Sequence, residues 1–253
     1  MHTVDTIMAN LARLRVHIAP VGFEIDRIVL PAKQMKADKI WLIRDENPAT
    51  EKAGAYITKI TTELKKDKID VQTIGSNRND VFKILKTVKE IFEQEKSNDL
   101  YVNVSSGSKI QAIACMMACM MFKESNAIPY YAEPESYPAT SGKQQSNGLQ
   151  RIVDLPKYQI HKPKQELILA LDIIQEKNGK ITKKEMAKLA EERKIIVVNA
   201  REENFEQARF ASLDKNIIQP LSEQWKFVEI EKIGRNRWIK LTDEGKHAAE
   251  FLL

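Results

Sequence analysis

The residues of this chain best placed to do chemistry form one polar segment, Asn103-Val104-Ser105-Ser106-Gly107-Ser108-Lys109. Residues 100–104 are apolar and largely β-branched or aromatic, as in a buried strand, and residues 110–122 predict a helix that is buried on most sides. A tight turn between the two needs a glycine, and it leaves the first N–H groups of the helix unpaired beside the positive end of the helix dipole. Such a helix start binds anions, phosphates above all, and the serines and Lys109 add donors and a positive charge. The segment therefore predicts a phosphate-binding turn.

The same turn also has a purely structural interpretation, because strands and helices of any α/β sheet are joined through glycine and serine. It is not a Walker A loop, since Ser108 separates Gly107 from Lys109 and Ile110 stands where that loop has a Mg²⁺-binding hydroxyl. It is not the dinucleotide fingerprint G-x-G-x-x-G either. The position of the turn in the fold has to decide between the two interpretations.

Length and composition predict a globular protein of two domains. The chain has 253 residues, of which 43% are hydrophobic and 30% charged. No apolar run reaches the ~18 residues of a membrane helix. Asp5 and Arg13 interrupt the apolar residues near the N-terminus, so no signal peptide is predicted and we expect a cytoplasmic protein.

The two cysteines, Cys115 and Cys119, and the four scattered histidines do not have the spacing of a metal site, and we expect no metal or cofactor. The net charge of +5 permits nucleic-acid binding without requiring it.

The N-terminal part, residues 1–157, alternates short apolar runs with segments of helical periodicity. Strands are predicted at 15–19, 39–43, 69–74, 100–104, 128–132 and 148–155, and helices at 24–35, 51–66, 80–95 and 110–122. This order predicts right-handed βαβ units and a Rossmann-like, mostly parallel sheet, in which ligands bind at the carboxyl ends of the strands. The predicted ligand-binding residues follow those strands: Pro20, Val21, Gly22, Phe23, Arg44, Ser76, Asn77, Ser105, Ser106, Gly107, Ser108, Lys109 and Glu133.

The C-terminal part, residues 163–253, has the order of an α+β winged helix-turn-helix domain. Helices are predicted at 164–177, at 182–193 after a capping box of Thr182 and Glu185, and at 199–217 after an Asn199–Glu202 cap. Strands at 226–231 and 237–241 and a helix after Thr242 complete the domain. In such a domain the third helix enters the major groove and the hairpin contacts the DNA backbone. The predicted DNA contacts are Gln207, Arg209, Ser212, Lys215 and Asn216 of the third helix and Arg235, Asn236 and Arg237 of the hairpin.

The third helix also carries acidic residues that argue for an ordinary solvated face. These are Glu202, Glu203, Glu206 and Asp214. Winged helices serve as dimerisation or protein-docking domains as well, so the sequence leaves that alternative to DNA binding open.

The whole order resembles archaeal regulators that join a CARF domain (CRISPR-associated Rossmann fold) to a helix-turn-helix. The resemblance is carried by residues 17–23, 103–109, 130–135 and 241–245, and segment 103–109 is its most specific part. CARF loops more usually read Asn-x-Thr-Gly-Gly-Thr-Lys. Ser105 and Ser106 depart from that pattern, whereas Gly107 and Lys109 match it.

The resemblance implies a homodimer whose pocket is shared across the two-fold axis and takes a cyclic oligoadenylate, most often cyclic tetra-adenylate. It also implies a transcriptional regulator that binds double-stranded DNA in response to that ligand. Two alternatives stay open. Some CARF domains cleave their own ring without a metal, and Lys109 and Ser106 would be the candidate catalytic residues here. A one-component regulator that senses another nucleotide or metabolite is the other alternative.

Overall fold

A computed structural model describes residues 13–138 and 144–253 of the chain. Asp5, on which the signal-peptide argument partly depends, lies outside these residues. The chain splits into two compact units, Met1–Ile160 and His161–Leu253, which are described separately.

The first unit is built on a six-stranded sheet. Its strands are β1 (Arg15–Pro20), β2 (Lys39–Asp45), β3 (Asp70–Ser76), β4 (Asp99–Asn103), β5 (Ile128–Glu133) and β6 (Arg151–Asp154). They lie in the order β3-β2-β1-β4-β5-β6, in which β1 to β5 are parallel and β6 runs antiparallel to β5. The predicted Rossmann-like, mostly parallel sheet is confirmed.

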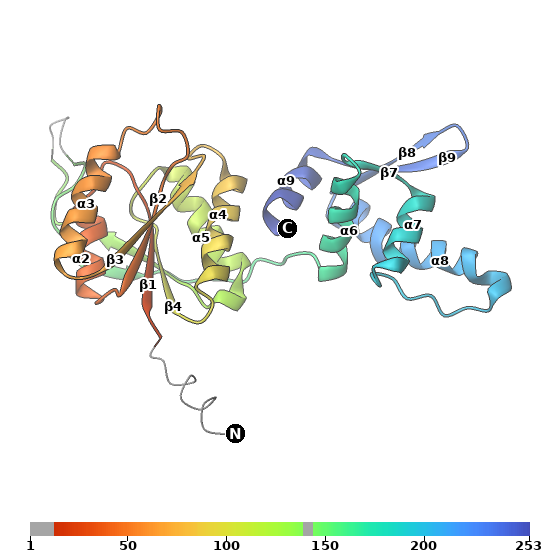
Figure 1. Cartoon of the computed structure of the whole chain (residues 1–253), viewed down its shortest axis with the longest axis horizontal. Coiled ribbons are helices and arrows are strands. Elements are labelled where there is room, and N and C mark those ends of the chain that lie inside the picture. Colours follow the sequence, from red (N-terminus) through yellow and green to blue (C-terminus); the bar gives the residue numbers. More distant parts are fainter. Residues whose placement is uncertain (1–12, 139–143) are drawn as a thin grey trace, which may run out of the picture. The chain divides into compact units, whose positions relative to one another are not determined.

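Two layers of helices cover this sheet. The helices are α2 (Asp26–Gln34), α3 (Gly54–Lys66), α4 (Val81–Gln94), α5 (Lys109–Met121) and the short η1 (Lys123–Ser125). Helices α2 and α3 lie on one face of the sheet, and α4 and α5 on the other (Figure 1). The chain must pass from β3 over β2 and β1 to reach β4, so the direction of winding changes between β1 and β4. Ligands of open α/β sheets bind at such a switch point.

Helix α5 is less buried than its apolar sequence predicts. The side of Ala114, Cys115 and Ala118 packs into the core, and burial raises the pKa of the Cys119 thiol to about 12. Ile113 on the opposite side is 53% exposed. The prediction of a helix buried on most sides holds for ten of its thirteen residues, which are buried or half-buried, but not for the side of Ile110 and Ile113. One apolar face of α5 is left uncovered by the sheet and helices of this unit.

The second unit is a winged helix, as predicted. It consists of α6 (Gln165–Glu176), β7 (Lys180–Thr182), α7 (Lys183–Glu192), η2 (Glu202–Asn204), α8 (Phe205–Leu213), η3 (Asp214–Ile218), η4 (Pro220–Gln224), β8 (Val228–Ile233), β9 (Asn236–Leu241) and α9 (Asp243–Leu252). The short strand β7, which the sequence analysis misses, pairs with β9 to give a three-stranded sheet in the order β7-β9-β8.

The third helix differs from its prediction at both ends. It begins with η2 at Glu202, so Asn199 does not cap it, and it continues beyond residue 217 through η3 and η4 to Gln224. Pro220 does not end it, because this proline occupies the first position of η4, where a missing N–H costs little. Of the predicted capping box on α7, the Thr182 half is present: its hydroxyl accepts from the Glu185 amide. The Glu185 carboxylate pairs with a lysine instead, Lys177, at 2.7 Å.

The sequence predicts no membrane-spanning helix and no metal site. In the parts of the chain that the structure describes, no helix is long and apolar enough to cross a membrane. Within the same residues no three His, Cys, Asp or Glu side chains are grouped to hold a metal ion.

Candidate functional site

Two turns meet at the switch point between β1 and β4, and each has a glycine where they touch. A Cβ atom on Gly22 would lie only 3.1 Å from the Cα of Gly107. Gly107 has a φ of +77°, and a Cβ atom there would lie 2.7 Å from the Cβ of Pro20. A side chain at either glycine would push the turns apart, so the close packing fixes the backbone of segment 104–108.

The hydroxyls of Ser105 and Ser106 stabilise this packing. Ser106 is 1% exposed and donates to the Pro20 carbonyl at 2.7 Å. The Ser105 hydroxyl accepts from the Ala132 amide at 2.6 Å and donates to the side-chain oxygen of Asn103 at 2.7 Å. Both serines, which the sequence analysis placed in the ligand site, therefore have intramolecular partners. The buried hydroxyl of Ser106 is also poorly placed for the catalytic role considered for it.

Helix α5 begins with a complete capping box. The Ser108 hydroxyl accepts from the Gln111 amide at 3.2 Å, and the Gln111 side chain accepts from the Ser108 amide at 2.9 Å. The Ser108 amide is therefore not free for a ligand, contrary to the prediction that the helix start is open throughout. The predictions omit Gln111, although Ser-x-x-Gln is a sequence signature of this box.

The remaining amides of the helix start are available. Within residues 13–138 and 144–253, the structure records no hydrogen bond for the backbone N–H groups of Gly107, Lys109 and Ile110. The Lys109 side chain is exposed, and no ion pair of it is recorded with the described residues. Three N–H groups, the helix dipole and one ammonium group thus point to an anion site at this turn.

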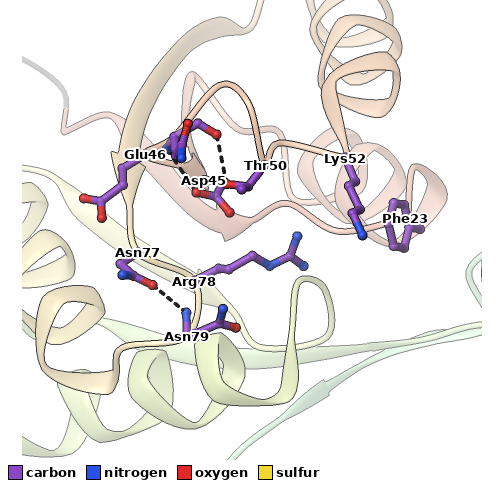
Figure 2. Close-up of a pocket in the computed structure, with 9 residues that line it drawn as sticks. Phe23, Asp45, Glu46, Thr50, Lys52, Asn77, Arg78 and Asn79 are labelled. Carbon is purple, nitrogen blue, oxygen red and sulfur yellow. Dashed lines mark hydrogen bonds between the residues drawn. The ribbon is translucent and has the colours of Figure 1, made fainter.

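A cavity of about 630 Å³ opens between the loops after β1, β2 and β3. Its lining residues are Phe23, Asp45, Glu46, Asn47, Thr50, Lys52, Asn77, Arg78 and Asn79. Figure 2 shows Arg78 and Lys52 extending into the space between the second and third loops, whereas Glu46 points away from them. The cations, side-chain amides and one aromatic ring are groups that bind phosphates and the edges and faces of bases.

The loops around the cavity are held by short-range hydrogen bonds. The Asp45 carboxylate accepts from the Asn47 amide at 3.0 Å, and the Asn77 side chain accepts from the Asn79 amide at 3.1 Å. Ser108 of the helix cap joins them, because its hydroxyl also donates to the Arg78 carbonyl at 3.3 Å. The helix start and the cavity are therefore neighbouring parts of one surface.

The structure brings together only some of the predicted ligand-binding residues. Phe23 and Asn77 line the cavity, and Gly107, Ser108 and Lys109 form the helix start. Four others are buried: Pro20, Val21, Gly22 and Ser76, of which Ser76 is 2% exposed. Arg44 donates a hydrogen bond to the Asp45 carbonyl at 2.9 Å and does not line the cavity. Glu133 pairs with Arg151 at the end of β5. Lys52, Arg78 and Asn79 were not among the predicted ligand-binding residues. Lys52 lies seven residues beyond the end of β2, in a loop whose path the sequence does not predict, whereas Arg78 and Asn79 directly follow the predicted Asn77.

His17 lies below the switch point in β1 and is fully buried. Its Nδ1 is 3.0 Å from the hydroxyl of Tyr130, and its ring stacks on Tyr101 with centroids 5.2 Å apart. Burial, with a smaller effect of Arg15, lowers the pKa of His17 to about 4. The imidazole is therefore neutral at pH 7 and belongs to the core beneath the site.

In the winged helix, several of the predicted DNA contacts of the third helix are used within the unit. Arg209 pairs with Glu191 at 3.1 Å and with Glu206 at 3.5 Å, and its side chain is 16% exposed. Ser212 donates to the Val197 carbonyl at 3.2 Å and accepts from the Asn216 side chain at 3.1 Å. The other two residues of the predicted set, Gln207 and Lys215, are exposed.

The basic residues at the tip of the hairpin are more exposed than Arg209 of the third helix. Arg235, Asn236 and Arg237 are all exposed around the turn between β8 and β9. Among the described residues no ion pair is recorded for Arg235 or Arg237, whereas Lys240 farther along β9 pairs with Glu229 at 3.0 Å. The tip therefore keeps its positive charge available to a partner.

Comparisons with known proteins give two family matches and a distant relative. Residues 15–137 match the family model described as HFX_2341_N:-like, N-terminal, and residues 166–252 match the DUF6293 C-terminal winged helix domain. The uncharacterized protein MJ1513 of Methanocaldococcus jannaschii is 27% identical over 212 residues, which are 72% of this chain and 63% of that protein.

Two solved structures are similar to the chain at low sequence identity. Can2 from Sulfobacillus thermosulfidooxidans, in complex with cyclic tetra-adenylate, is 13% identical with a TM-score of 0.43, over 93% of this chain and 61% of Can2. Csm6 from Enterococcus italicus, bound to cyclic hexa-2′-fluoro-hexa-dAMP, is 9% identical with a TM-score of 0.43, over 84% of this chain and 56% of Csm6. The chain spans less than two thirds of the length of each of these three proteins. The first unit is therefore similar to the HFX_2341_N-like N-terminal domains, and the second unit is similar to the C-terminal winged helix domain of DUF6293.

Proposed function

We propose that this protein is a ligand-responsive regulator that binds a cyclic oligoadenylate at the switch point of its Rossmann-like domain and DNA through its winged helix. The observation that carries the ligand part is the start of α5. There the capped turn presents three unpaired N–H groups and Lys109 directly beside a cavity lined by Arg78 and Lys52. A cyclic oligoadenylate needs both features, because it alternates phosphates with purine bases.

The two parts of the site have complementary tasks in this proposal. Phosphates contact the amides of Gly107, Lys109 and Ile110 and the Lys109 ammonium group. Purines enter the cavity, where the amide side chains of Asn77 and Asn79 can pair with base edges and Phe23 offers an aromatic face.

The uncovered face of α5 supports a homodimer. Ile110 and Ile113 are 37% and 53% exposed, and Met116, Met117 and Met120 are half-buried beside them. A continuous apolar face of this kind on a single chain is typical of an interaction site. In a two-fold dimer formed through α5, two copies of its first turn would meet the repeated phosphates of a symmetric ring. Cyclic tetra-adenylate is the ring that we propose.

The DNA part of the proposal rests on the winged helix and on the tip of its hairpin. Arg235 and Arg237 supply positive charge suited to phosphate contacts. The third helix contributes less than expected, because Arg209 is held by Glu191 and Glu206. Contacts to base edges would then come from Gln207, Lys215 and Asn216.

The direct test is a calorimetric titration with cyclic tri-, tetra- and hexa-adenylate, with linear tetra-adenylate as the matched control. We expect the cyclic tetramer to bind most tightly, at one ring for two chains. Absence of binding by every cyclic adenylate would refute the ligand assignment. DNA affinity should then be measured with and without the ring at a promoter of the same genome, and an unchanged affinity would refute regulation by the ligand.

Cleavage of the ring is the second candidate activity. Lys109 is exposed and could stabilise a developing charge during in-line attack, but the hydroxyl of Ser106 is already used by the Pro20 carbonyl. Incubation of protein and ring without metal, followed by chromatography, distinguishes the two activities: linear di-adenylate identifies a nuclease, and intact ring identifies a sensor. A different co-purifying nucleotide or metabolite, detected by mass spectrometry, would favour the one-component regulator.

A further inference from the structure

The winged helix unit contains a cavity of its own, with a volume of about 610 Å³. It is enclosed by the stretch before α6 together with the first turn of α6, by the loop after α7, by η3, and by η4 with the residue that follows it. Its floor is apolar, because Leu167, Ile195, Ile196 and Ile217 line it and are almost fully buried. This volume is in the usual range of small-molecule sites.

One wall of the cavity is an aromatic ring in a fixed position. Trp225 is half-buried, and its ring lies against that of Phe227 with centroids 5.6 Å apart. The chain turns sharply after it, since Lys226 has a φ of +58° and the Thr242 hydroxyl donates to the Lys226 carbonyl at 2.7 Å. The indole is therefore positioned before any ligand arrives, which lowers the entropic cost of binding.

The rim of the cavity is positively charged. It carries three lysines, Lys162, Lys164 and Lys215, together with His161, against the single carboxylate of Glu166. Several other lysines of this unit form ion pairs with carboxylates, as Lys180 does with Glu231 at 2.7 Å. No ion pair of Lys164 or Lys215 is recorded in the part of the chain that the structure describes.

We propose that this cavity is a second ligand site, which takes a planar aromatic ring joined to one anionic group, of about the size of a mononucleotide. The ring would lie on Trp225 and the apolar floor, and the anionic group would sit between Lys164 and Lys215. An apolar floor with a few convergent charged groups is the usual composition of such sites. Lys215 and Asn216 belong to the third helix, so the ligand would contact the element through which winged helices read DNA.

The test uses the full chain and two probes that differ in their anionic group, adenosine 5′-monophosphate and indole-3-acetate. Calorimetry should show binding of at least one of them. Lys164→Ala and Lys215→Ala should each weaken it about tenfold, as expected for loss of one charge-assisted hydrogen bond. The matched control is Lys184→Ala, an exposed lysine on α7 outside the cavity, which should change the affinity less than twofold. Thermal unfolding of each variant checks that the domain stays folded.

Two results would overturn the proposal. One is absence of binding by both probes at about 1 mM, which corresponds to a free energy weaker than about −4 kcal/mol. The other is binding that Lys109→Ala abolishes and Lys164→Ala leaves intact, because the probe would then occupy the Rossmann-like domain. Binding of the nucleotide alone supports a phosphate ligand, and binding of indole-3-acetate alone supports a carboxylate. The outcome is independent of whether a cyclic oligoadenylate binds to the first domain.

Discussion

The hydroxyl of Ser108 donates a hydrogen bond to the backbone carbonyl of Arg78 over 3.3 Å while it accepts one from the amide of Gln111. One side chain thus caps α5 and anchors the loop after β3. The helix start that we propose to bind anions and the cavity lined by Arg78 are therefore joined by a direct contact. A ligand that contacts both would therefore bind to two parts whose relative position is already fixed.

Lys109→Ala should weaken binding of cyclic tetra-adenylate by about 1–3 kcal/mol, because it removes a charge-assisted contact to phosphate. Lys109 is exposed at the first position of α5, so the melting temperature should stay unchanged. Lys86→Ala on the exposed side of α4 is the matched control. Equal affinities of the wild type and the Lys109 variant in calorimetry would remove the helix start from the site.

Gly107→Ala should destabilise the first domain by about 1–3 kcal/mol. The new Cβ atom would lie 2.7 Å from the Cβ of Pro20, on a backbone with φ of +77° that L-residues rarely adopt. Gly54→Ala, where nothing lies within 4 Å, should be neutral or slightly stabilising. Urea unfolding measures both, and equal midpoints for the two variants would contradict the packing of the turns.

His17 should make the first domain sensitive to mild acid. The pKa of His17 is about 4 in the folded chain, against an ordinary value of 6.5. Between these values the unfolded chain binds the additional proton, so the free energy of unfolding should fall as the pH is lowered from about 7 towards 4, by about 3 kcal/mol. His17→Gln should lose this part of the pH dependence. His161→Gln, at an exposed position, should retain it. The same slope in the wild type and the His17 variant, measured by urea unfolding at several pH values, would disprove the assignment.

Arg235→Ala should weaken DNA binding to a similar extent on all sequences and reduce the slope of log affinity against log salt by about 1, as loss of one phosphate contact requires. Arg209→Ala should act differently, because its guanidinium joins α7 to α8 through Glu191 and is largely buried. We expect it to lower the stability of the winged helix by about 1–2 kcal/mol. Fluorescence anisotropy at several salt concentrations tests the first variant, and thermal unfolding tests the second. A loss confined to one DNA sequence would show that Arg235 contacts bases.

If the chain forms the proposed dimer through α5, Ile113→Glu should convert it to a monomer, because this substitution places a charge in the apolar face of the helix. Ile230→Glu is the control, since Ile230 is about equally exposed, at 50%, but lies on β8 of the winged helix. Sedimentation velocity gives the mass of each. A wild-type monomer, or an Ile113 variant that stays dimeric, would rule out this interface.

The order of strands and helices was predictable from the sequence because alternation of short apolar runs with helical periodicity depends on local side-chain patterns. Exceptions occur where tertiary contacts prevail. The third helix of the winged helix continues through Pro220 because the proline falls at the start of η4, and β7 is a strand only because Ile181 pairs with Ile239 of β9.

The candidate site was predictable only in part. Gly107, Ser108 and Lys109 were found because a strand-to-helix turn has a recognisable sequence. Arg78 and Lys52 were missed, because their proximity depends on the paths of two loops far apart in the sequence. The partners of Ser105 and Ser106, on β5 and at the end of β1, likewise exist only in three dimensions.

The capped first turn of α5 and its exposed apolar face belong to one continuous helix of 13 residues, about 20 Å long. A continuous helix of this length behaves as a rigid element. In the proposed dimer, a tilt of α5 caused by a ligand at its first turn would therefore be passed along the helix to the partner subunit.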